Sequence, residues 1–203
     1  MPSRLTISIL VVYGALIWFL VLVFEGVSVA GFFEPITIVI GAISVGLIAF
    51  DRYGWSLPPF SRLISRPDLR GTWMGTLDSD HIRAREPIET VLVVHQTFSD
   101  LKLRLITAES KSMTTTASIV VEPDKRVSVV NVYRNDPRLE LQARSRPHRG
   151  TLEVMVEGPE ADRLTGEYWT DRKTTGRVEL RRVSREQAKD WEHAKELADG
   201  SGT

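Results

Sequence analysis

The sequence predicts two N-terminal transmembrane helices, an all-β domain and a short C-terminal helix. Two long apolar runs lie within the first fifty of the 203 residues. Beyond residue 71 apolar and polar residues alternate with a period of two, which is typical of half-buried strands. Because no segment of helical period interrupts these strands, we expect an antiparallel, eight-stranded up-and-down β-barrel.

Charged residues are distributed unevenly, although the 26 basic and 26 acidic side chains give no net charge. They are nearly absent before Asp51 and dense after it. This pattern is typical of a chain with a membrane part and a polar part rather than of a uniform globule. The sequence contains no cysteine, which excludes a disulfide framework and thiolate chemistry.

The first apolar run, residues 5–24, has about the 20 residues that a helix needs to cross a bilayer. The second, residues 32–50, is a further candidate span, and Pro35 suits the first turn of its helix. A cleaved signal peptide is the alternative, but the first apolar core is too long for one and a second run follows at once. Ala42 and Gly46 give the second span a face of small residues, which suits packing between the two spans or between chains.

Basic residues flank the two predicted spans on one side only. Arg4 precedes the first span, and Arg52 and further arginines follow the second. The connection between the spans contains Glu25 and Glu34 and no base. Because cytoplasmic flanks of membrane helices are enriched in Lys and Arg, we expect both termini and the barrel to be cytoplasmic.

The chain divides into four expected parts. They are a transmembrane hairpin (1–50), a juxtamembrane linker (51–70), a β-barrel ligand-binding domain (71–183) and a C-terminal helix with a disordered tail (184–203). Aromatic residues in the linker are typical anchors at a membrane interface. Ser184 and Gln187 form a capping-box pattern, which predicts that the last helix begins there.

Eight short segments have the strand pattern. They are residues 72–77, 88–96, 101–107, 114–121, 126–133, 151–157, 164–170 and 176–182. A sandwich also satisfies this pattern, but closure into a barrel removes exposed strand edges. An outer-membrane barrel does not fit, because Lys102, Arg104 and Glu153 would lie on a face that contacts lipid.

The chain shows no catalytic constellation. Its four histidines are scattered without metal-ligand spacing, and alternation places His95 inside the barrel. No nucleophile-elbow, Walker or dinucleotide-binding glycine motif is present, so we expect a binding protein without enzymatic activity, cofactor or metal. The G-T-W sequence at residues 71–73 resembles the G-x-W that opens lipocalin-like barrels. There the Trp closes one end and stacks under an Arg of the last strand, here Arg181 or Arg182.

Polar and aromatic residues gather toward one end of two predicted strands. Tyr168 and Thr170 share the interior face of Leu164, and Tyr133 shares the interior face of Val129. An aromatic ring that stacks on a base, a guanidinium that binds phosphate, and hydroxyls or amides for base edges are what a nucleotide needs. The alternative is that the tyrosines fill the barrel and the nearby arginines are surface charge.

The connection predicted for residues 134–150 is long and rich in arginine. Its arginines are Arg134, Arg138, Arg144, Arg146 and Arg149. Such a loop can attract an anion. We expect it to face the turn at residues 171–175 across one opening of the barrel, and the candidate site is wrong if the two lie at opposite ends.

Two longer motifs carry a resemblance to a known family. They are R-P-D-L-R-G-T-W-M-G-T-L at residues 66–77 and L-T-G-E-Y-W-T-D-R-K-T-T-G-R-V-E-L-R-R-V at residues 164–183. Placed after two apolar spans, they resemble the SMODS-associating two-transmembrane, β-strand-rich effectors. These are the CD-NTase-associated protein 15 family of bacterial CBASS antiphage defence.

The resemblance implies a cyclic dinucleotide as activating ligand of the barrel. It also implies that the chain oligomerises in the cell inner membrane, as a multi-pass protein, and disrupts that membrane to cause cell death. The expected partners are the cyclic dinucleotide, the lipid bilayer and further copies of the chain, and neither DNA nor RNA. The matching motif positions give Tyr168, Thr170, Arg172 and Thr174 as ligand-binding residues, and the barrel geometry adds Tyr133, Asn135 and Arg138.

Two other functions agree with the same barrel. A membrane-tethered, lipocalin-like carrier of an apolar ligand predicts a lumen lined by aliphatic side chains and open at one end. A structural adaptor predicts recruitment of partners through the barrel and tail, without any small ligand.

Overall fold

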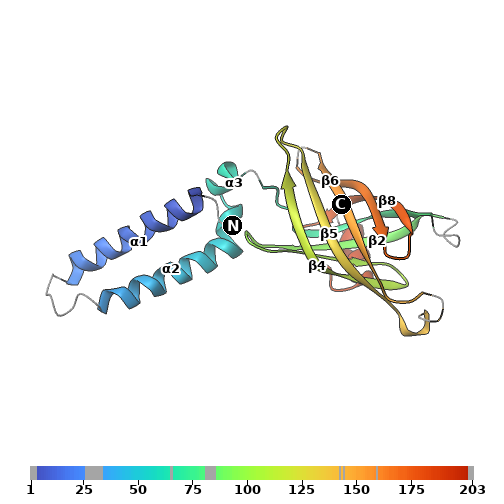
Figure 1. The fold of residues 1–203 in the computed structure, drawn as a ribbon, viewed down its shortest axis with the longest axis horizontal. Coiled ribbons are helices and arrows are strands. Elements are labelled where there is room, and N and C mark those ends of the chain that lie inside the picture. Colours follow the sequence, from blue (N-terminus) through green and yellow to red (C-terminus); the bar gives the residue numbers. More distant parts are fainter. Residues whose placement is uncertain are drawn as a thin grey trace. The chain divides into compact units, whose positions relative to one another are not determined.

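The computed structural model in Figure 1 contains two compact units, Met1–Phe60 and Ser61–Thr203. It describes residues 4–25, 34–64, 66–80, 86–141, 143, 145–158 and 160–200. Arg144, one of the arginines of the predicted loop, lies outside the described residues.

The N-terminal unit is a pair of packed helices. Its elements are α1 (Arg4–Glu25), α2 (Glu34–Arg52) and η2 (Gly54–Ser56), and a short α3 (Phe60–Leu63) follows. A Cβ atom on Gly46 would lie 3.1 Å from the Tyr13 ring of α1, so this glycine packs closely against α1 of the same chain. By length and hydropathy, none of the helices among the described residues qualifies as a membrane span.

The second unit is a closed barrel of antiparallel strands joined in chain order. The strands are β1 (Gly71–Ser79), β2 (Ile88–Gln96), β3 (Leu101–Ile106), β4 (Ser110–Val121), β5 (Val127–Pro137), β6 (His148–Glu157), β7 (Arg163–Thr170) and β8 (Thr175–Ser184). The prediction of an eight-stranded barrel is therefore confirmed. In the described part of the connection between β5 and β6 there is a short 3₁₀ turn, η3 (Leu139–Leu141).

The barrel interior is filled by one cluster of buried side chains. Period-two alternation sends Trp73, Leu92, Val154 and Leu180 inward, where they contact one another with almost no exposed surface. Directly paired residues on neighbouring strands share a face, as Trp73 and Leu92 do. Toward the start of β1 most interior residues are apolar, although Gln96 is buried there, and the buried Asn131, Asn135 and Thr170 lie toward the opposite end.

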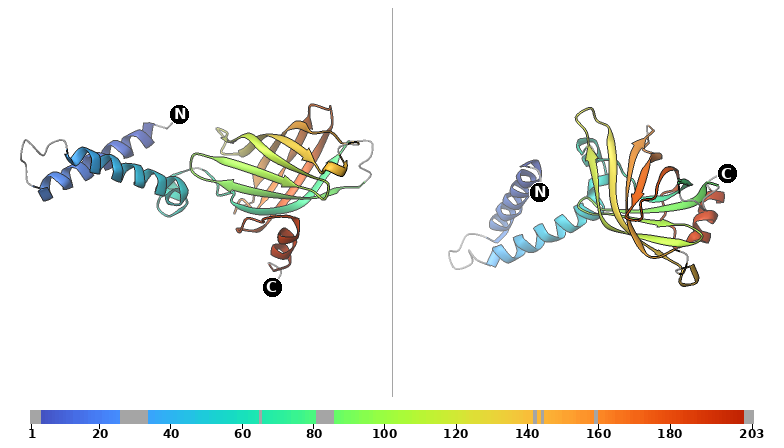
Figure 2. Two further views of the ribbon diagram at one scale, coloured as in Figure 1. Left: turned by 90° about the horizontal axis from the view of Figure 1, so that it is seen from below. Right: turned by 45° about the vertical axis from the view of Figure 1, so that its right-hand side comes forward.

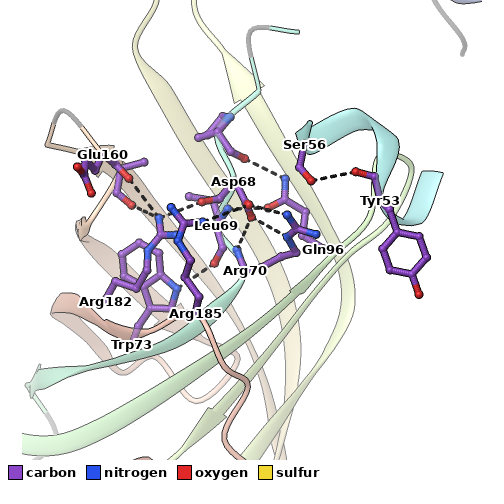
Figure 3. A network of polar contacts seen from close by, with 12 residues as sticks. Tyr53, Ser56, Asp68, Leu69, Arg70, Trp73, Gln96, Glu160, Arg182 and Arg185 are labelled. Carbon is purple, nitrogen blue, oxygen red and sulfur yellow. Dashed lines mark hydrogen bonds and ion pairs between the residues drawn. The ribbon is translucent and has the colours of Figure 1, made fainter. Parts of the chain in front are cut away.

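Trp73 and Arg182 seal the end of the barrel at which the chain enters β1. The Trp73 indole N–H donates to the Leu69 carbonyl at 3.0 Å, and the Arg182 guanidinium lies 4.7 Å from the ring centroid. Arg182 also donates to the carbonyls of Asp68, at 2.9 Å, and Ala161 (Figure 3). The predicted stacking of the G-x-W tryptophan under an arginine of the last strand is confirmed, with Arg182 as the arginine.

Residues just before β1 belong to the packing of this sealed end. Leu69 is buried in the interior cluster, and its backbone N–H donates to the Gln96 side-chain oxygen at 2.8 Å. The Gln96 amide in turn donates to the Pro67 carbonyl at 3.0 Å. Pro67 and Leu69, which precede β1, are therefore part of the barrel packing.

The C-terminal helix α4 spans Trp191–Gly200 and lies on the outer wall of the barrel (Figure 2). Ala194 and the preceding Ala188 are buried against Val91 and Val93, the outward residues of β2. The predicted helix start at Ser184 is wrong, because β8 continues to that residue. Asp190 accepts the N–H of His193 at 3.0 Å and caps the helix instead.

The prediction that His95 points into the barrel is also wrong. The His95 side chain is on the outer surface, and its ring lies 3.2 Å from the Gln187 side chain. Val94 and Gln96 occupy the inward positions on either side of it.

Candidate ligand-binding site

The turn after β7 and the connection between β5 and β6 meet at one end of the barrel, opposite the sealed end. The Arg172 guanidinium donates to the Ser145 hydroxyl at 3.3 Å and to the Arg146 carbonyl at 3.5 Å. Its other terminal nitrogen lies 3.3 Å from Nε2 of His148, the first residue of β6. The two segments that the candidate site requires at one opening are therefore neighbours.

The turn between β7 and β8 has a geometry that projects Arg172 from the rim. The Lys173 N–H donates to the Thr170 carbonyl at 3.0 Å, and Lys173 itself adopts a left-handed φ of 62°. Asp171 is held by β6, because its N–H donates to the Arg149 carbonyl at 3.0 Å and its carboxylate accepts the Arg149 N–H at 3.0 Å. The Arg172 side chain is exposed beyond this anchored corner.

Tyr168 and Thr170 point inward below the turn, as alternation predicts. They are 7% and 9% exposed. Gly176 on β8 lies directly opposite Tyr168, and a Cβ atom there would be 2.5 Å from the ring. Thr170 and Thr174 join their hydroxyls at 2.6 Å, so both threonines line the same corner.

Tyr133 on β5 has an arrangement like that of Tyr168. Its cross-strand partner is Gly150 on β6, and a Cβ atom there would lie 2.4 Å from the Tyr133 hydroxyl. Each tyrosine ring therefore covers a glycine of the adjacent strand. Burial raises the pKa of both hydroxyls, that of Tyr133 well above its usual range, so both remain neutral hydrogen-bonding groups.

Amides and hydroxyls continue the polar surface along β4 and β5. Asn135 is buried and its side-chain oxygen accepts the Ser112 hydroxyl at 2.7 Å. One step deeper, Asn131 accepts the Thr114 hydroxyl at 2.8 Å. Such pairs keep polar groups satisfied within an interior that is otherwise apolar.

His148 is a residue of this rim that the sequence did not indicate. Its ring Nδ1 lies 3.2 Å from the Arg146 carbonyl, and its Nε2 faces Arg172. A neutral ring with the proton on Nδ1 satisfies both contacts, because it donates to the carbonyl and accepts from the guanidinium. Burial and, to a smaller extent, the Arg172 charge lower the pKa of His148, although the Arg146 carbonyl acts in the opposite sense.

The arginines of the predicted loop are not all at this rim. β5 continues to Pro137 and β6 begins at His148, so the loop is shorter than predicted. Arg134 belongs to β5, and its exposed side chain binds Asp136 at 3.1 Å. Arg138 follows β5 at the rim; its N–H donates to the Glu109 carbonyl at 3.1 Å, and its side chain is exposed.

Six of the seven candidate residues thus surround one polar end of the barrel. The seventh, Arg138, follows the end of β5 and lies farther out on the rim. The set offers two aromatic rings, a guanidinium, hydroxyls and an amide. Among the described residues no group of His, Asp and Glu side chains could hold a metal ion. A surface cavity of about 370 Å³ lies elsewhere, on the outer wall between Arg163, Glu179 and Arg181, and none of the candidate residues lines it.

A closed barrel with one sealed apolar end and one polar, arginine-bearing end has the features of a small-ligand-binding protein. The chain belongs to the family described as Cap15, cyclic dinucleotide receptor domain, which matches residues 64–182. It is also similar to CD-NTase-associated protein 15 of Staphylococcus schleiferi. The two are 28% identical over 170 residues, which cover 82% of this chain and 90% of the relative.

Proposed function

We propose that this chain is a CBASS effector whose barrel binds a cyclic dinucleotide at the polar end. The observation that carries the proposal is the contact of Arg172 with the start of β6, which places a guanidinium at the opening where Tyr133 and Tyr168 line the interior. The family match supports the ligand class.

The chemistry of the polar end suits both parts of such a ligand. A guanidinium binds a phosphodiester oxygen through charge-assisted hydrogen bonds, and Arg172 projects into solvent where a phosphate can reach it. Aromatic rings stack on bases, and the hydroxyls of Thr170 and Thr174 with the Asn135 amide can bond base edges. The proposed role of the chain is recognition of the ligand without chemical conversion.

The two N-terminal helices are proposed to lie in the bacterial inner membrane, with both termini and the barrel in the cytoplasm. The apolar run of residues 5–24 and the basic flanks support this arrangement. Large apolar side chains, such as Phe19 at 61% exposed and Val45 at 68%, remain uncovered on these helices. Ligand binding would then promote assembly of the chain in the bilayer, disruption of the membrane and cell death.

The barrel interior does not favour a carrier of apolar ligands. Such a carrier needs an open aliphatic lumen, whereas the aliphatic part of this interior is one cluster of side chains in mutual contact. Trp73 and Arg182 further seal the apolar end. A ligand at the polar end needs no such lumen.

The test is binding of cyclic dinucleotides to the full chain in lipid nanodiscs, measured by calorimetry. We expect saturable binding of at least one cyclic dinucleotide and none of the matching linear dinucleotides. The same ligand added to liposomes that carry the chain is expected to release an enclosed dye. The proposal would be contradicted if no cyclic dinucleotide bound in a panel that covers the common combinations of bases and linkages. Binding without dye release would contradict its membrane part.

A further inference from the structure

The barrel has one strand whose edge is only partly paired. β3 ends at Ile106 and β4 extends from Ser110 to Val121, so β4 is much the longer of the two. Their ladder joins Arg104, Leu105 and Ile106 to Met113, Ser112 and Lys111. Among the described residues, no strand pairs with residues 115–121 of β4 on the β3 side.

A side chain ends the ladder between the two strands. The Thr114 hydroxyl accepts the Leu103 N–H at 2.7 Å, in the place of a backbone partner, and its oxygen also lies 2.9 Å from the Leu103 carbonyl. The register with β5 shifts between Thr114 and Thr116, which marks a bulge at the same point. Beyond it the β4–β5 hairpin diverges from the β2–β3 hairpin (Figure 1).

The uncovered part of β4 is nevertheless held as an extended strand. Every residue from Thr116 to Val121 pairs with β5, the last with Val127. A strand fixed on one side presents the backbone N–H and C=O groups of its other side to a further strand. Its edge is therefore ready for pairing without a change in the barrel.

The sequence of this edge lacks the features that normally block pairing. Residues 115–121 read T-T-A-S-I-V-V, with no charge and no proline. Most of these residues are β-branched, which favours strand pairing. Thr116, Ser118 and Val120 are exposed on the outer side.

We infer that residues 115–121 of β4 pair with the same residues of a second copy of this chain. Among the described residues, the other strands are paired on both sides over most of their lengths except β3, whose residues 101–103 lack a strand partner on the β4 side. A second copy therefore offers the edge of residues 115–121 and no other described edge of comparable length. Antiparallel pairing about a two-fold axis at Ser118 sets Thr116 opposite Val120 and Ala117 opposite Ile119. No like charges face one another in this register.

This interface does not depend on the identity of the ligand. It is a contact between the barrels of two copies. It rests on the proposed function only because such a contact would contribute to the proposed assembly of the effector. Its test is therefore made on the full chain in nanodiscs and native membranes without any cyclic dinucleotide. A cross-link through Ser118 would stand even if no cyclic dinucleotide bound.

Because the chain has no cysteine, single-cysteine variants report one position each. Ser118→Cys is expected to form disulfide-linked dimers at least about tenfold more than Ser128→Cys, because directly opposed residues bring Cα atoms within disulfide range. Ser128 is the matched control, since it is paired with Val120 on one side and Met155 on the other. Equal cross-linking of the two variants, or none at Ser118, would overturn the inference.

Register and charge give a second arm. Thr116→Cys and Val120→Cys are expected to cross-link with each other in a mixed sample more than either does alone. Ser118→Lys and Ser118→Asp should each weaken the dimer, because like charges then face one another, and an equal mixture should restore it. Ser118 is exposed, so these changes leave the barrel folded. Failure of the mixture to restore the dimer would contradict the proposed register.

Discussion

The Arg172 guanidinium lies 3.3 Å from Nε2 of His148 and joins the turn after β7 to the first residue of β6. These residues are 24 positions apart in the chain. The contact brings a cation to the rim above Tyr133 and Tyr168, the two rings that cover Gly150 and Gly176.

Replacing Arg172 tests whether this cation binds the ligand. Arg172→Ala is expected to weaken cyclic dinucleotide binding about tenfold to a hundredfold, which corresponds to loss of one charge-assisted hydrogen bond. Its thermal unfolding should be nearly unchanged, because the side chain is exposed. Calorimetry and a melting curve on each variant give both quantities.

Arg181→Ala is the control for this change. Arg181 is also exposed, but it lies on the outer wall of β8 and away from the rim. Loss of the Arg181 side chain should leave the affinity for the cyclic dinucleotide unchanged. Unchanged affinity in the Arg172→Ala variant would remove Arg172 from the site.

His148 is expected to make stability depend on pH. Burial lowers the pKa of its folded form, so the unfolded chain binds more protons once the pH falls to the usual histidine value of about 6.5. The free energy of unfolding should therefore decrease as the pH falls from 8 through that value toward the folded pKa. His148→Gln should lessen this slope when urea unfolding is compared at several pH values, and an unchanged slope would assign it to other groups.

Gly150 is expected to fix the position of the Tyr133 ring. A Cβ atom at residue 150 would lie 2.4 Å from the Tyr133 hydroxyl and 2.9 Å from the Trp169 carbonyl. Gly150→Ala should therefore destabilise the barrel, by about 1–3 kcal/mol as for other overpacked sites, and displace the ring. Urea unfolding measures the first effect and tyrosine fluorescence or an NMR shift the second.

The double variant Gly150→Ala/Tyr133→Ala separates the two clashes. If the ring is the main obstacle, adding Tyr133→Ala should cost less stability in the Gly150→Ala background than in the unchanged chain. Equal costs in the two backgrounds would place the obstacle at the Trp169 carbonyl.

Alternation made the strands and the inward faces of Tyr168, Thr170 and Tyr133 predictable. Strand ends were less predictable, because residues 134–137 read R-N-D-P and resemble a turn. In the structure Asn135 instead pairs with His148, and Pro137 pairs with Ser110. Cross-strand partners decided these positions, and one sequence does not reveal them.

His148 was missed for the same reason. Its neighbours, P-H-R-G, have the composition of a loop, and a role at the rim becomes visible only once Gly150 is known to pair with Tyr133. Counting back two residues from Gly150 then places His148 on the same face. At Ser184 the local sequence was misleading in another way. The capping-box pattern predicted the start of a helix, but Ser184 pairs with Thr72 and is the last residue of β8.

Arg182 gives the last prediction, at the sealed end. Arg182→Ala removes hydrogen bonds to the Asp68 and Ala161 carbonyls and the contact with the Trp73 ring. We expect a loss of about 3 kcal/mol in the free energy of unfolding, because half-buried carbonyls lose a charged donor. Arg182→Lys should recover little of it, since an ammonium cannot span both carbonyls and the ring.

Arg185→Ala is the matched control for this end. Arg185 also binds Asp68, at 3.4 Å, but its side chain is largely exposed, so its loss should cost less than about 1 kcal/mol. Neither variant should change the affinity for a cyclic dinucleotide by more than the loss of folded protein explains, because the rim lies at the other end. A specific loss of cyclic dinucleotide binding in a folded Arg182→Ala chain would show that the two ends of the barrel are coupled. Equal stability of the Arg182→Ala and Arg185→Ala variants would contradict the role of Arg182 in sealing the barrel.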